Sequence, residues 1–192
     1  MLRLVLAFVL MLFAASASAQ DVRTGNPGNA PNVQSPRSGA PTGNERLTGH
    51  VAVGEHAPDF SLVAAGGGAW RLKQSRGRWT AVFFTDRRDD LPRLEALAAS
   101  LDSLHLNVIA LLDEKPQALA PWRSGSRSPL VALADESGVI AGLYGLWDGE
   151  NGRTRDGLFL LDPNGVVRLA LLGQKVGAPS LRGLVQTAVE GL

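Results

Sequence analysis

The sequence predicts an α/β domain in which helices cover both faces of a mixed central β-sheet, giving three layers. In the first half of the chain, apolar runs alternate with helical patterns, which is typical of a parallel βαβ unit. A hairpin and a final helix follow, so at least one strand pair is antiparallel. Apolar residues make up 45% of the chain and charged residues 19%, as in globular proteins.

The stretch 79–104 organises the rest of the chain. The run Ala81–Phe84 is β-branched and aromatic, which predicts a buried strand. A charged loop follows directly at 86–90. Asp89 or Asp90 is expected to cap the next helix, and Pro92 suits its first turn. The apolar positions that predict this helix, at 90–104, recur at steps of three and four: Leu91, Leu94, Leu97, Ala98, Leu101 and Leu104.

Further elements follow from similar patterns. Short strands are expected near 60–62 and 69–72, separated by a triple-glycine turn, and a buried strand is expected at 106–112. Residues 130–134 form another apolar run. Helical patterns occupy 116–123, 137–144 and 178–192, and the turn at 162–165 joins two strands into a hairpin. The expected core residues are Phe83, Phe84, Leu94, Leu101, Val108, Ala110, Leu133, Phe159 and Leu161.

The first 48 residues are expected to lie outside the folded domain. Residues 1–19 combine Arg3, an apolar stretch and Ala17-Ser18-Ala19, a pattern typical of a secretory signal peptide. An uncleaved membrane anchor is the alternative. Residues 20–48 are rich in Gly, Pro and Asn, which predicts a disordered linker. The globular domain is then 49–192, and the expected location is the periplasm or the exterior of a bacterial cell.

Composition excludes several kinds of chemistry. The chain has no cysteine, so disulfides, thiolate catalysis and Cys-bearing metal sites are excluded. Its formal net charge is +1 and no basic stripe stands out, which argues against a nucleic-acid partner. The three histidines, His50, His56 and His105, have no ligand-like spacing, so no metal or cofactor is expected.

Four segments resemble the redoxin family, the alkyl hydroperoxide reductase and thiol-specific antioxidant (AhpC/TSA) group that includes the peroxiredoxins. The segment V-G-E-H-A-P-D-F-S-L at 53–62 is similar to the family's entry motif, and R-G-R-W-T-A-V-F-F at 76–84 to its lead into the central strand. The segment L-A-D-E-S-G-V-I-A-G-L-Y-G-L-W at 133–147 and the hairpin F-L-L-D-P-N-G-V-V at 159–167 are similar to two further family blocks. The resemblance implies a thioredoxin-like fold and an antioxidant oxidoreductase.

The chain departs from this family at the reactive site. A thioredoxin-like Cys-x-x-Cys would lie between the central strand and the helix, and a peroxidatic cysteine would fall at Leu91 or its neighbours. Neither is present. The loop 151–157 also lacks the proline that faces the active site in thioredoxin-like proteins, although Arg153 or Arg155 matches an arginine that the family often has there.

The candidate site is therefore a binding site formed by two charged loops, with no catalytic residue assigned. The strand-to-helix loop and the loop before the hairpin are expected to meet at one end of the sheet, where α/β proteins bind ligands. The alternative is that 86–90 is a solvated loop that caps a helix. The basic loop 122–127 has the same two interpretations. The candidate residues are Asp86, Arg87, Arg88, Asp89, Arg153, Arg155 and Asp156.

These observations predict an exported redoxin-fold protein without thiol chemistry, acting as a binding or accessory module of the cell envelope. The expected partner is an envelope protein or a small anionic ligand; membrane contact is expected only if residues 1–19 are retained. The alternative is an antioxidant oxidoreductase that works without cysteine or with a partner's thiol.

Overall fold

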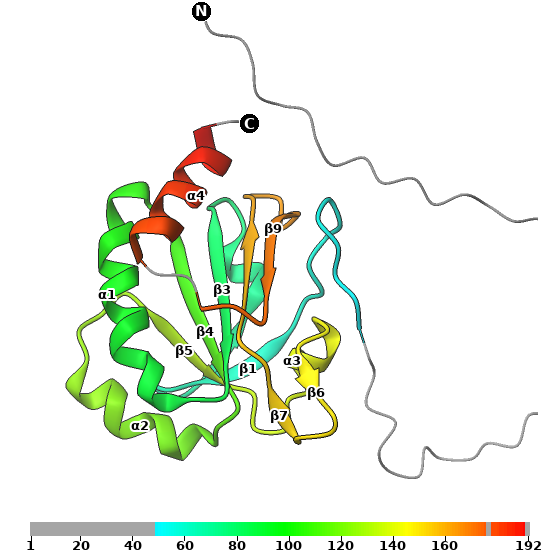
Figure 1. Cartoon of the computed structure of the whole chain (residues 1–192). Helices are drawn as coiled ribbons and strands as arrows, with labels where there is room; N and C mark the ends of the chain where they lie inside the picture. Colours follow the sequence, from blue (N-terminus) through cyan, green and yellow to red (C-terminus); the bar gives the residue numbers. More distant parts are fainter. Residues whose placement is uncertain (1–48, 176–177, 191–192) are drawn as a thin grey trace, which may run out of the picture. The chain divides into compact units, whose positions relative to one another are not determined.

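The computed structural model describes residues 49–175 and 178–190, which form the α/β domain in Figure 1. The expected signal peptide at 1–19 and linker at 20–48 lie outside the described residues. Within the described part of the chain, no helix combines the length and the apolar character that crossing a membrane requires.

A seven-stranded mixed sheet forms the central layer, in the order β2-β1-β5-β4-β3-β8-β9. Strands β3, β4 and β5 are parallel to one another, while β1, β2, β8 and β9 pair antiparallel with their neighbours. The strands are β1 (Ser61–Ala64), β2 (Ala69–Arg71), β3 (Thr80–Thr85), β4 (Asn107–Leu112), β5 (Val131–Ala134), β8 (Gly157–Leu161) and β9 (Val167–Leu172). The run that was expected to be the central strand is β3. It lies inside the sheet, and its six residues are all buried.

Helices cover both faces of this sheet, as the sequence predicts. Helices α1 (Leu91–Leu101), α2 (Pro116–Gly125) and α4 (Ala178–Glu190) contribute buried residues to one apolar cluster. Helix α3 (Val139–Leu143) contributes to a second cluster, which also takes in the entry segment through Val51 and Phe60. Alternate residues of β3 point to the two clusters: Phe83 to the first and Phe84 to the second.

The predicted core is confirmed, since all nine expected core residues are buried. On the α3 face, Phe84, Tyr144 and Phe159 form an aromatic group with ring centroids 5.0 to 5.9 Å apart. The Tyr144 hydroxyl donates a hydrogen bond to the carbonyl oxygen of Pro58 at 3.0 Å, which ties the entry segment to this group. Burial raises the pKa of Tyr144 well above its ordinary value, so this hydroxyl stays protonated.

The predicted hairpin is also confirmed, as β8 and β9 joined by the turn at 162–165. The carboxylate of Asp162 accepts hydrogen bonds from the backbone N–H groups of Asn164 (2.8 Å) and Val166 (2.9 Å). It also accepts two hydrogen bonds from the guanidinium of Arg168, at 2.9 and 2.7 Å. Gly165 supplies the positive φ of 78° that this tight turn requires.

Two local expectations differ from the structure. The segment 151–157 is not simply a loop, because β7 (Arg153–Thr154) pairs with β6 (Trp147–Asp148) in a separate two-stranded sheet. Asp90 occupies the N-cap position of α1, but its side chain makes no capping hydrogen bond. Its carboxylate is engaged instead by Thr85 and Lys175, so side-chain partners compete successfully with the helix N-terminus.

Candidate functional site

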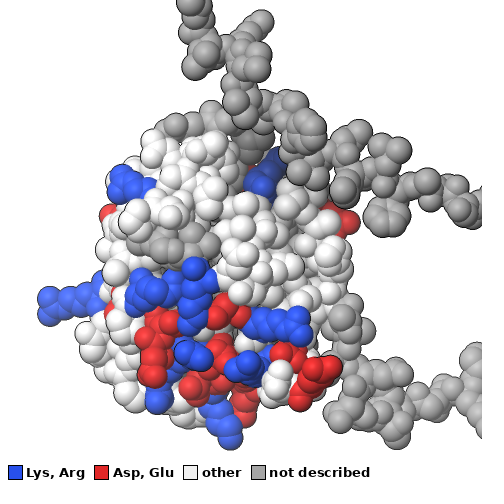
Figure 2. All heavy atoms as spheres, viewed as in Figure 1, with Lys and Arg blue, Asp and Glu red and all other residues white. Residues whose placement is uncertain are grey.

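The two charged loops meet at one end of the sheet because of the strand order. Strand β3 ends at Thr85 and β8 begins at Gly157, and the antiparallel register places Phe84 opposite Gly157. The loop after β3 and the residues before β8 therefore lie next to each other. In Figure 2, acidic and basic side chains gather in the lower half of the molecule, while the upper half shows few charges.

Asp86 joins the two loops directly. Its carboxylate lies 3.6 Å from the guanidinium of Arg153 and 3.7 Å from that of Arg87. The first distance confirms the prediction that residues 86–90 and 153–156 lie within ion-pair reach. The side chain of Asp86 is only 20% exposed, whereas those of Arg153 and Arg87 are 55% and 64% exposed.

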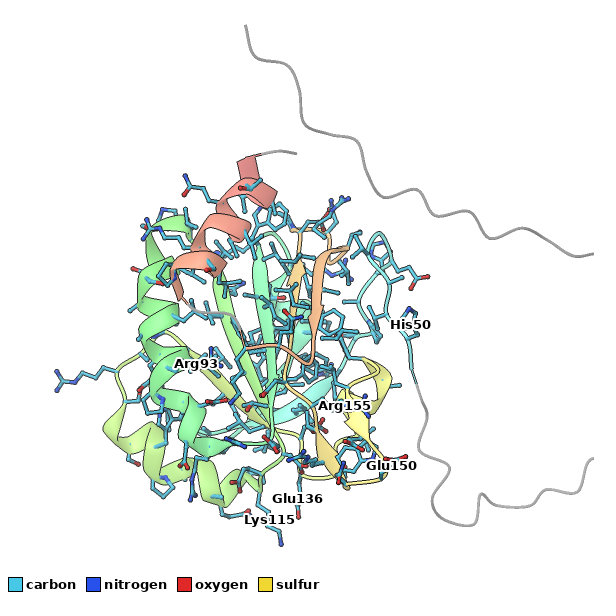
Figure 3. All side chains as sticks on the ribbon, in the orientation of Figure 1. His50, Arg93, Lys115, Glu136, Glu150 and Arg155 are labelled. Carbon is cyan, nitrogen blue, oxygen red and sulfur yellow. The ribbon has the colours of Figure 1, made fainter. Side chains whose placement is uncertain are left out.

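The other candidate residues point in different directions. Arg155 pairs with Asp148 of β6 at 3.6 Å, and Arg88 donates to the carbonyl oxygen of Ala118 in α2 at 3.2 Å. Asp89 is exposed and forms no ion pair among the residues that the structure describes. Figure 3 shows Glu150, in the turn between β6 and β7, and Arg155, just after β7, with Lys115 and Glu136 close together at the same end of the molecule. The candidate site is thus a broad surface rather than one focused constellation.

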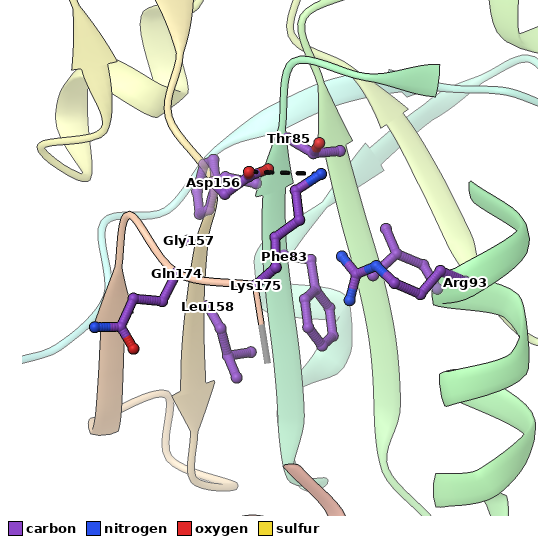
Figure 4. Close-up of a pocket in the computed structure, with 10 residues that line it drawn as sticks. Phe83, Thr85, Arg93, Asp156, Gly157, Leu158, Gln174 and Lys175 are labelled. Carbon is purple, nitrogen blue, oxygen red and sulfur yellow. Dashed lines mark ion pairs between the residues drawn. The ribbon is translucent and has the colours of Figure 1, made fainter. Parts of the chain in front are cut away.

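Lys175, which the sequence analysis did not select, connects both loops. Its ammonium lies 2.5 Å from the carboxylate of Asp90. It also lies 3.6 Å from the carboxylate of Asp156, and Figure 4 shows this second ion pair. The Thr85 hydroxyl donates to the same Asp90 carboxylate at 3.0 Å. Lys175 comes from the connection between β9 and α4, 85 residues after Asp90, and no sequence pattern marks it.

The electrostatics of this group favour a charged Asp90. Burial by itself would raise the pKa of Asp90, but hydrogen bonds from Lys175 and Thr85 and the nearby charges of Lys175 and Arg93 outweigh it. The pKa therefore lies below its ordinary value. At the neighbouring pair, the hydrogen bonds from Asn151 and the charge of Arg155 hold the pKa of Asp148 below its ordinary value.

Little open space lies beneath these ion pairs. The hollow between β3, β8 and α1 measures only about 10 Å³, and its floor includes Phe83 and Leu158. Leu91, at the first position of α1, is 1% exposed and belongs to the apolar core. No group of three or more His, Asp or Glu side chains that could hold a metal ion occurs among the described residues. The hollow beneath these ion pairs is too small to enclose a small molecule.

The family model for the AhpC/TSA family matches residues 53–170, more than half of the chain. The chain belongs to the AhpC/TSA family. This confirms the resemblance seen in the entry motif and the hairpin.

Curated relatives of this AhpC/TSA member carry peroxiredoxin names. The chain is 30% identical over 136 residues to a peroxiredoxin from Thermoplasma volcanium, covering 62% of this chain and 64% of that protein. It is 31% identical over 137 residues to peroxiredoxin 1 from Brugia malayi, covering 60% and 58%. The chain thus spans less than two thirds of the length of these relatives.

Solved structures confirm the fold class. A thiol peroxidase from Chromobacterium violaceum superposes with a TM-score of 0.63 at 20% identity, covering 76% of this chain and 93% of the other. Peroxidoxin BcpB from Mycobacterium tuberculosis gives the same TM-score at 16% identity, covering 74% and 99%. These likenesses show the thioredoxin-like peroxiredoxin fold alone.

The chain departs from the AhpC/TSA family at the start of α1, where a reactive cysteine is expected. The family resemblance places a reactive cysteine at Leu91 or its neighbours, and the full sequence contains no cysteine. In the structure, Leu91 is buried in the core, and the residue before it, Asp90, contacts Thr85 and Lys175.

Proposed function

We propose that this AhpC/TSA member is a binding or accessory module without thiol redox chemistry of its own, and that it acts in the cell envelope. The single observation that carries the proposal is that no cysteine occurs at the start of α1, where the family resemblance places one at Leu91 or its neighbours and where Leu91 is 1% exposed. Thiol chemistry requires a thiolate, and neither the residue type nor the apolar surroundings of this position provide one.

The arrangement of exposed and buried charges indicates what the module binds. In each of the pairs Asp86–Arg153 and Asp148–Arg155, the carboxylate is largely covered while the arginine is more than half exposed. The outermost charges of these pairs are therefore cationic. A partner with acidic groups can contact them bidentately, whereas a basic partner cannot reach the carboxylates without displacing the arginines. The hollow of about 10 Å³ favours an acidic protein surface over an enclosed small anion.

Exposed ion pairs add little to folding stability, which supports a role in recognition. Pairs of this exposure contribute about 0–1 kcal/mol each, because water and salt screen them. A dense group of such pairs at one end of the sheet is therefore better explained by partner binding than by the stability of the fold.

An envelope location is part of the proposal and rests on the signal-like pattern at 1–19. Expression of the full gene in a bacterium, followed by fractionation and N-terminal sequencing, tests it. A mature chain that begins at Gln20 in the periplasm supports export. A cytoplasmic chain that retains Met1 would refute it.

The alternative is an antioxidant oxidoreductase, which the family membership favours. Such an enzyme would work without cysteine or with a thiol from a partner protein. Peroxide consumption and insulin reduction by the purified chain, each with and without a reduced thioredoxin-type donor, separate the two functions. We expect rates equal to those of the donor alone. A rate that rises in proportion to this chain would overturn the non-redox proposal.

The binding role is tested with poly-L-glutamate as a defined acidic probe. We expect parent protein to bind it more tightly at low salt, and Arg87→Ala with Arg155→Ala to weaken binding several-fold. The double variant Arg71→Ala with Lys73→Ala is a matched control, since it removes two exposed cationic side chains that lie outside the charged loops and outside the basic loop 122–127. Equal weakening by both double variants would mean that only net charge matters and would refute a site at this end.

A further inference from the structure

The parallel strands leave a second hollow at the end opposite the charged loops. Strands β3, β4 and β5 run in the same direction, so their first residues share one end of the sheet and their last residues share the other. A cavity of about 320 Å³ lies at the first end, where Arg78 precedes β3 and Asn107 and Val131 begin β4 and β5. It is far roomier than the hollow of about 10 Å³ at the charged end.

One wall of this cavity is apolar and the rim is polar. Trp70 of β2 and Val131 of β5, both half-buried, provide the accessible apolar wall. Ile109 of β4 also borders the cavity but is fully buried. The rim carries Arg78, Asp102 and His105. A wall of this kind buries the apolar body of a small ligand, and polar groups at the rim fix its orientation.

The two opposite charges on the rim do not neutralise each other. Arg78 and Asp102 form no ion pair with one another or with any other described residue. No hydrogen bond of either side chain is recorded among the described residues, in contrast to the arginines of the charged end. One cationic and one anionic group are therefore available to a ligand at the mouth of a cavity that has one apolar wall.

The backbone just after Asp102 has an unusual conformation. His105 has φ of 54°, and it is the one non-glycine residue with positive φ in the part of the chain that the structure describes. Its N–H donates to the carbonyl oxygen of Asp102 at 2.9 Å, so the turn that carries Asp102 closes at the cavity. Asn107 fixes the other side, where its side-chain nitrogen lies 3.4 Å from the carbonyl oxygen of Ser75 and from the Thr80 hydroxyl.

We propose that this cavity binds a small zwitterion with an apolar body, of the chemical class of the apolar α-amino acids. The carboxylate of the ligand accepts hydrogen bonds from Arg78, its ammonium donates to Asp102, and its side chain packs on Trp70 and Val131. The proposal is independent of the function proposed for the charged end, because the two places share no residue.

Binding is tested by NMR titration of the full ¹⁵N-labelled chain with three probes: L-leucine, N-acetyl-L-leucine, which lacks the ammonium, and L-leucinamide, which lacks the carboxylate. We expect saturable shifts at the Trp70 indole and at 105–108 with L-leucine. Each modified probe should bind about 3- to 10-fold more weakly, because one charge-assisted hydrogen bond is lost.

Two exposed-residue variants assign the charges. Arg78→Gln should bind L-leucine and L-leucinamide equally, and Asp102→Asn should bind L-leucine and N-acetyl-L-leucine equally. Arg127→Gln is the control, since it removes an exposed arginine that does not line the cavity. The absence of saturable shifts at tens of millimolar L-leucine, or variants that discriminate among the probes as the parent does, would overturn the proposal. Thermal melts that match the parent's show that the variants are folded.

Discussion

The carboxylates of the hairpin and of the charged end are both mostly covered, yet they have different kinds of partners. Asp162 in the hairpin accepts hydrogen bonds from two backbone N–H groups of its own turn and from two of the three side-chain nitrogens of Arg168. Asp86 at the charged end pairs with the flexible, exposed side chains of Arg153 and Arg87, at longer distances of 3.6 and 3.7 Å. Asp162 therefore fixes the backbone of its turn, whereas Asp86 contacts exposed side chains that can exchange their partners.

Asp135 shows that the hairpin is not an isolated case. After β5, its carboxylate accepts the backbone N–H groups of Ile140 (3.2 Å) and Ala141 (2.8 Å) at the start of α3. Burial raises the pKa of Asp135 and outweighs these hydrogen bonds, so protonation of this group becomes easier on folding. Asp135 and Asp162 both lie in segments that resemble the family, while the charged end lies where the chain departs from it. The family features that remain are therefore those that build the fold.

The largest change in the free energy of unfolding is expected from substitutions in the aromatic core. Phe159→Ala should lower the free energy of unfolding by about 3–5 kcal/mol, because the side chain is fully buried against Phe84 and Tyr144. Chemical denaturation measures this change. Phe83→Ala, on the opposite face of the sheet, should fall in the same range of about 3–5 kcal/mol. Losses of under about 0.5 kcal/mol at both positions would contradict the placement of the central strands.

The second effect concerns the hairpin carboxylate. Asp162→Ala should lower the free energy of unfolding by about 2–3 kcal/mol, because buried hydrogen-bond donors lose a charged acceptor. Burial alone would raise the pKa of Asp162, but the hydrogen bonds from Val166, Arg168 and Asn164 outweigh it and lower the pKa. The stabilisation is thus present above the ordinary pKa of 3.8 and is lost as the pH falls through the lower, folded value. A parent–variant difference that stays constant down to about pH 2 would contradict this account.

A smaller change in the free energy of unfolding is expected at Asp90, which contacts Lys175 and Thr85. Asp90→Asn should lower the free energy of unfolding by about 1 kcal/mol at neutral pH, because it weakens contacts to Lys175 and Thr85. The folded pKa of Asp90 is lowered, so the difference from the parent should shrink as the pH falls below 3.8. It should also shrink in high salt. An undiminished difference at high salt would instead assign the loss to packing.

The smallest change in stability is expected from the exposed arginines. Arg87→Ala with Arg155→Ala should leave the melting temperature almost unchanged, since each pair contributes about 0–1 kcal/mol. Differential scanning calorimetry of the parent and the double variant measures this. A large drop in melting temperature would contradict this prediction and would show that the arginine pairs stabilise the fold, as the hairpin carboxylate does.

The sequence by itself determined the layers, the central strand, the hairpin and the family. The apolar period of α1 and the buried run of β3 are local patterns, and burial follows directly from them. The proximity of Asp86 to Arg153 was also predictable, because an antiparallel neighbour of β3 must begin at the end where β3 stops. The binding roles of the candidate residues stay predictions.

Tertiary structure alone decided the rest. It placed Lys175 between Asp90 and Asp156 and turned Arg88 toward α2, because side-chain partners depend on which elements pack together and not on spacing along the chain. Asp90 does not cap the helix, because the ammonium of Lys175 competes with the N–H groups of the helix end for its carboxylate. It also opened a cavity beside Arg78, where the first residues of β4 and β5 meet Trp70 of the edge strand β2.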